Sequence, residues 1–133
     1  MIEIGVAVIV AAAIMGVLDF LWLGFIAKSL YYGEMGDILL KKPNMTAALL
    51  FYAIYVVGAV VLVVLPALAD DSLLMALGFG ALLGFVAYAT YDLTNLATMK
   101  GFSKKIVMID LAWGTFITAV VCAGSYIAAS LIG

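Results

Sequence analysis

The sequence predicts an all-α integral membrane protein, a four-helix transmembrane bundle with both chain ends on the outer side of the membrane (N-out/C-out). Three observations predict this class: hydrophobic residues make up 68% of the 133 residues, the mean hydropathy is +1.32, and every basic residue is a lysine confined to two connections. A soluble domain contains about 45–50% apolar residues. We therefore expect a single transmembrane domain over residues 1–133.

Four apolar runs are long enough to cross a hydrocarbon core of about 30 Å, for which about 20 helical residues suffice. They cover residues 4–27, 45–68, 72–96 and 105–131. The first is expected to be a retained helix, because Glu3 stands where a signal peptide carries positive charge. Short connections favour antiparallel neighbours, so the second, third and fourth helices are expected to run up and down in sequence.

The long connection between the first two helices, residues 28–44, reads KSLYYGEMGDILLKKPN. One interpretation places residues 30–41 along the membrane interface, with Tyr31 and Tyr32 among the lipid headgroups. An irregular loop is the alternative. Pro43 predicts a break before the second helix, and Ser72 or the acids before it can cap the third.

The lysines predict the orientation of the chain. All six lie in the connections after the first and third helices, and the opposite side carries only acids, Glu3, Asp70 and Asp71. Positively charged connections stay in the cytoplasm, so both chain ends are expected outside. The same bias argues against a small exporter that inserts in both orientations, because that arrangement needs balanced connections.

Three acids lie inside apolar runs: Asp19, Asp92 and Asp110. Each costs about 2.5–3.5 kcal/mol at a bilayer centre. At a rise of 1.5 Å per residue from the nearest connection lysine, Asp19, Asp92 and Asp110 are expected about 13, 12 and 8 Å into the membrane. Because these depths are similar, all three acids are expected to meet in one polar cluster. No arginine is present to pair with them. Burial without a cation favours the neutral form of at least one acid, or a proton shared by two.

Small residues at helical spacing predict which helix faces turn inward. On the third helix Gly80, Gly84, Tyr88 and Asp92 follow at intervals of four, with Asn95 next on the same side. Small residues allow close approach of helices in lipid, and the positions expected to do so are Gly16, Gly80, Gly84 and Gly114. The hydroxyls of Thr90, Thr94 and Thr98 can bond to the carbonyl one turn back.

The acids and their polar and aromatic neighbours form the candidate site for a ligand or a proton. Its members are Asp19, Asp92, Asn95, Asp110, Tyr88, Tyr91, Trp22 and Trp113. The alternative is that these groups make interhelical hydrogen bonds that only hold the bundle together. A short echo, Asp-Phe-Leu-Trp from residue 19 and Asp-Leu-Ala-Trp from residue 110, suggests an inverted repeat, although four residues match easily by chance.

Several functions are excluded by what the sequence lacks. It has no histidine, which argues against haem or zinc bound through imidazole. No lysine lies in mid-helix for a Schiff base, and no glycine-rich phosphate loop is present. We therefore expect no cofactor and no metal site, and nothing indicates nucleic-acid binding. The single Cys122 cannot form an internal disulfide and is expected to be a small packing residue.

Three stretches carry a resemblance: DFLWLG from residue 19, YDLTNLAT from residue 91 and DLAWG from residue 110. With them, almost the whole chain resembles a family of small bacterial membrane proteins known as domain of unknown function twenty-one seventy-seven. The resemblance implies a multi-pass, four-helix protein of the bacterial cytoplasmic (inner) membrane without an established activity. It also implies that the family pattern includes Asp19, Trp22, Tyr91, Asp92, Asn95, Asp110 and Trp113.

Three functional hypotheses follow. The favoured one is a proton-linked transporter or small-ligand-binding membrane protein, expected as a homodimer because four helices are few for a complete pathway. The second is a structural or assembly subunit of a larger membrane complex, suggested by the short connections and small-residue seams. The third is a lipid- or quinone-modifying enzyme with an aspartate as general acid or base. No nucleophile or cofactor motif accompanies that acid, so an enzyme is not expected.

Overall fold

Four long helical spans make up the protein in the computed structural model, which describes residues 2–26, 28–36 and 44–132. The first span is α1 (Ile2–Leu21) continued by the π-helical η1 (Trp22–Ile26), and the second joins α3 (Met45–Ala59), η3 (Val60–Val64) and α4 (Leu65–Ala69). The third and fourth are α5 (Leu73–Thr98) and α6 (Lys104–Ser130). All four are long and apolar enough to cross a membrane, as the hydropathy predicted.

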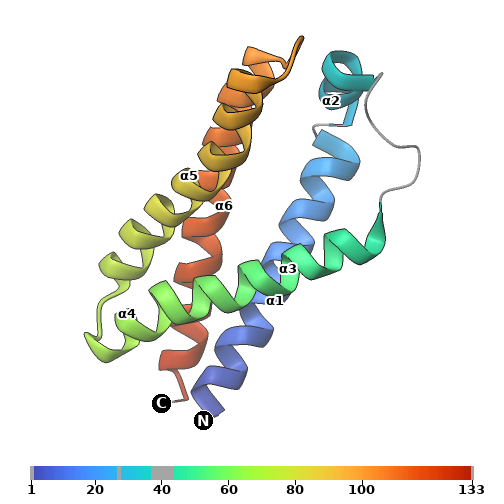
Figure 1. The fold of residues 1–133 in the computed structure, drawn as a ribbon. Helices are drawn as coiled ribbons and strands as arrows, with labels where there is room; N and C mark the ends of the chain where they lie inside the picture. The colour runs from blue at the N-terminus through green and yellow to red at the C-terminus, as the bar shows by residue number, and fades with distance from the viewer. Residues whose placement is uncertain (1, 27, 37–43, 133) are drawn as a thin grey trace.

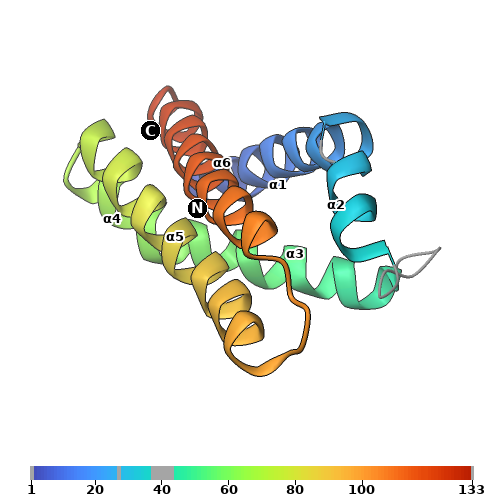
Figure 2. The same cartoon turned by 90° about the horizontal axis from the view of Figure 1, so that it is seen from above.

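Helix α6 is the centre of the arrangement. It packs most extensively against α5 and next against α1, and it lies between these two helices in the view from above (Figure 2). The second span crosses the others obliquely (Figure 1): α3 and η3 contact α1, while η3 and α4 contact α5 and α6. Both chain ends lie at one end of the bundle (Figure 1). Side chains of α1 and α5 therefore face different sides of α6.

Three helices begin at polar caps. The Ser72 hydroxyl accepts a hydrogen bond from the amide of Met75 at 3.0 Å, which caps α5 as predicted. Asn44 caps α3 and Ser103 caps α6 in the same way. Each cap satisfies one of the amide groups that the first turn of a helix leaves without a partner.

Near Pro66 the second span passes from a π-helical turn to an α-helix. Proline has no amide hydrogen and disturbs the turn before it, and the segment just ahead of it is the π-helical η3. There the amide of Leu65 donates to the carbonyl of Val60, five residues back. The altered turn keeps these backbone groups bonded inside the chain, as a bilayer requires.

A short helix, α2 (Lys28–Met35), follows the first span. The Ser103 hydroxyl donates to Glu34 Oε1 at 2.8 Å, which joins α2 to the start of α6. Only part of the interfacial segment expected at residues 30–41 can be compared, because Asp37–Pro43 and the side chains of Tyr31 and Tyr32 lie outside the described residues. Its place at the membrane interface stays a prediction.

Candidate functional site

Glycines bring α5 and α6 into direct contact below the acids. A methyl group at Gly84 would overlap the Gly114 carbonyl oxygen and lie 2.6 Å from Thr118 Oγ1. One at Gly114 would overlap the ring of Tyr88, and one at Gly80 would lie 2.9 Å from the Cβ of Cys122. Because the two helix backbones approach so closely at these glycines, the facing side chains are held in a narrow range of positions.

Gly16 does not make the close helix contact expected of it. A Cβ at this position would meet nothing within 4 Å, and Gly16 lines a groove between α1 and α3 instead. The close approach between α1 and α6 occurs at Gly124, where an added Cβ would overlap the end of the Ile14 side chain. Spacing along one helix does not identify which helix faces it, so Gly124 was missed.

Asp92 and Asp110 form a carboxyl pair between α5 and α6. Asp92 is completely buried, at 0% exposure, and its interacting neighbour is the carboxyl group of Asp110. Within the part of the chain that the structure describes, neither Asp92 oxygen accepts a hydrogen bond from a donor group. Ionised carboxylates only accept hydrogen bonds, so these two groups can bond to each other only when one is protonated.

Asp19 has a hydrogen-bond partner outside this pair. It is 9% exposed, and its Oδ2 accepts a hydrogen bond from the Tyr52 hydroxyl on α3. Among the described residues no three acidic, histidine or cysteine side chains gather closely enough to hold a metal ion. The acids predicted to form one cluster have different partners: Asp92 on α5 interacts with Asp110 on α6, whereas Asp19 on α1 bonds to Tyr52 on α3.

Tyr88 connects the two acidic positions. Its ring lies against the backbone of Gly114, and its hydroxyl is within electrostatic reach of both Asp19 and Asp110. A phenol can donate and accept a hydrogen bond. The half-buried Tyr88 is thus close enough to acids of both α1 and α6 to interact with them.

Trp22 and Trp113 stack on each other across α6 and the first span. Their ring centroids are 4.4 Å apart and their planes differ by 6°, so the two short Asp-x-x-Trp stretches meet in space. Both indole nitrogens are buried without a hydrogen-bond acceptor in the described residues. Buried indole N–H groups usually find a partner, which makes this stack part of the candidate site.

The other two candidates lie at the margin of the site. Tyr91 is 59% exposed, and its ring meets Phe102 edge-on with centroids 6.3 Å apart. Its hydroxyl neighbours the half-buried Asn95. Thr90 and Thr98 behave as predicted, since their hydroxyls donate to the carbonyls four residues back at 2.7 and 2.9 Å; for Thr94 the bond stays a prediction.

Two polar residues of the second span were missed by the sequence reasoning. Besides the bond from Tyr52 to Asp19, the Tyr55 hydroxyl lies 2.6 Å from Thr118 Oγ1 in the buried interior. Tyr52 and Tyr55 are three residues apart, which places them on one helix face. That spacing was the available signal, although it could not identify their partners on other helices.

A four-span membrane protein with a carboxyl pair between two spans and a buried aromatic stack is the class that this fold and site define. The chain belongs to the family described as "Predicted membrane protein (DUF2177)", whose model matches residues 4–127. This confirms the resemblance drawn from the motifs, and the matched range contains every candidate site residue. No curated protein and no solved structure matches the chain.

Proposed function

We propose that this protein takes up and releases a proton at the Asp92–Asp110 pair and couples that proton to the transport or binding of a small ligand. The observation that carries the proposal is the burial of Asp92, whose oxygens lack a donor in the described chain and face a second carboxyl group. Two neighbouring carboxylates in a low-dielectric interior cannot both ionise without a large penalty. A shared proton removes that penalty.

The surroundings of the pair support an exchangeable proton. Tyr88 is within electrostatic reach of both Asp110 and Asp19, and Asp19 is itself hydrogen-bonded to Tyr52. Ionisable groups inside a membrane commonly mark proton or substrate pathways. Asp19 and Tyr52 provide a second proton-accepting position on the other side of α6.

The direction of the pathway follows from the lysines. The connection from α5 to α6 and the helix α2 lie at the end of the bundle opposite the chain termini (Figure 1). The positive-inside rule assigns the lysine-bearing end to the cytoplasm, which supports N-out/C-out insertion in a bacterial inner membrane. Four spans leave little room for a complete pathway, so we infer that the working unit is a homodimer.

Infrared spectroscopy of the purified protein in lipid nanodiscs tests the shared proton directly. A protonated carboxyl group gives its own C=O stretching band, which shifts in D₂O and disappears on ionisation. We expect the wild-type protein to show such a band and Asp92→Asn to lose it. Asp71→Asn is the matched control, because Asp71 lies exposed in the turn before α5 and its substitution should leave the band unchanged.

Proteoliposomes containing a pH-sensitive dye separate binding from transport. The proposal predicts that an imposed pH gradient drives proton entry through the wild-type protein and not through Asp92→Asn. A wild-type protein without the carboxyl band, or a band of equal size in Asp92→Asn, would refute the proton site. A normal band without proton movement would refute transport and retain a ligand-binding protein.

A further inference from the structure

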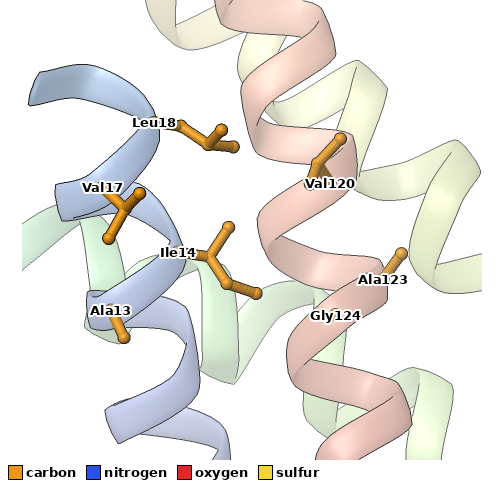
Figure 3. A pocket seen from close by; sticks show the side chains of 7 residues that line it. All are labelled: Ala13, Ile14, Val17, Leu18, Val120, Ala123 and Gly124. Atoms are coloured by element: carbon orange, nitrogen blue, oxygen red, sulfur yellow. The ribbon is translucent and has the colours of Figure 1, made fainter. Parts of the chain in front are cut away.

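Two grooves lie along the first span, one on each side. The groove between α1 and α6 has a volume of about 540 Å³ and aliphatic walls. Figure 3 shows Ile14 and Leu18 of α1 pointing toward α6 across it. The described residues that line this groove carry no polar side chain, so they offer nothing that selects one apolar chain over another.

The groove between α1 and α3 differs by its polar end. It has a volume of about 360 Å³, and Tyr52 lies among apolar and small residues in its wall. The space exists because Ala12, Gly16 and Ala53 present little side chain to it. At Gly16 an added Cβ would meet nothing within 4 Å, so the groove is open where a larger residue would close it.

The carboxyl group of Asp19 lies next to Tyr52 at that end. It lies one helical turn beyond Gly16, and its Oδ2 accepts the hydrogen bond from Tyr52. The chain has no arginine, and its lysines all lie in the connections. An acid 9% exposed beside an apolar groove is complementary to a cation carried on an apolar tail.

We propose that the α1–α3 groove binds a membrane-soluble amphiphile with a primary amine head. The ammonium group bonds to Asp19 beside Tyr52, and the tail lies along Ala12, Gly16 and Ala53. A charge-assisted hydrogen bond is about twice as strong as a neutral one, so a neutral alcohol with the same tail binds less tightly. An anionic head is repelled by Asp19. This site uses Asp19, which is outside the Asp92–Asp110 pair. Binding of the amine therefore does not depend on the proton proposed for that pair.

Native mass spectrometry with three probes of equal tail length tests the head-group preference. Dodecylamine, dodecanol and dodecanoate are titrated separately against the full-length protein in detergent, and one-to-one adducts are counted. We expect a saturable dodecylamine adduct with an apparent affinity about tenfold higher than that of dodecanol, equivalent to about 1.4 kcal/mol, and the weakest binding for dodecanoate. Equal binding of all three probes would overturn the proposal.

Adjacent alanines on α1 provide a matched pair of variants. Ala12→Leu fills the α1–α3 groove, whereas Ala13→Leu makes the same change in the α1–α6 groove. Ala12→Leu should lower dodecylamine affinity at least about tenfold, and Ala13→Leu should leave it unchanged. Asp19→Asn should abolish the advantage of the amine over the alcohol. An equal loss in both leucine variants, or a preserved amine preference in Asp19→Asn, would refute the site.

Discussion

Gly84→Ala is the sharpest test of the contact between α5 and α6. The added methyl group overlaps the Gly114 carbonyl oxygen and lies 2.6 Å from Thr118 Oγ1. The overlapped oxygen belongs to a rigid helix backbone, so the clash is relieved only by moving the helices apart. Overpacking costs about 3 kcal/mol at the upper end of its usual range, and replacing glycine in a helix returns up to about 1 kcal/mol. We expect a net destabilisation of about 2 kcal/mol.

The matched control is Gly78→Ala on the same helix, where an added Cβ meets nothing within 4 Å. It should be neutral or stabilise the protein by up to about 1 kcal/mol through helix propensity. The assay is reversible unfolding in mixed lipid–detergent micelles by added SDS, followed by circular dichroism. If Gly84→Ala proves as stable as Gly78→Ala, the close packing inferred for this seam is wrong.

Three further outcomes are expected. A double-mutant cycle of Tyr55→Phe and Thr118→Val should give a coupling energy of about 0.6–1.7 kcal/mol, the range of membrane hydrogen bonds; strictly additive effects on unfolding would contradict the 2.6 Å contact. Trp22→Phe should abolish the exciton signal that the stack with Trp113 produces in far-ultraviolet circular dichroism, and an unchanged spectrum would exclude the stack. Ser72→Ala should cost about 1 kcal/mol of stability and speed hydrogen exchange in the first turn of α5, and equal exchange rates would argue against the cap.

The spacing of small residues correctly predicted the face of α5 that packs against α6. Gly80 and Gly84 lead along α5 to Tyr88 and Asp92, and each of the two glycines meets backbone atoms of α6. The same logic assigned a contact to Gly16, which has open space beside it. Spacing identifies one face of a helix, but the neighbouring helix decides whether that face is a contact or a groove.

The sequence allowed a prediction of depth in the membrane but not of lateral position. A rise of 1.5 Å per residue predicts similar depths for all three acids, which led to the expectation of one cluster. In the structure Asp92 interacts with Asp110 across α5 and α6, and Asp19 bonds to Tyr52 on α3. The stack of Trp22 on Trp113 likewise depends on which helices are neighbours.

The amino-acid sequence by itself determined that this chain is a membrane protein with four spans, because the bilayer requires about 20 apolar helical residues for each crossing. The tertiary structure alone decided which acids pair, which glycines touch a neighbour and where the grooves open. These features depend on the lateral order and tilt of the helices. In lipid that order is set by packing and interhelical hydrogen bonds rather than by hydropathy.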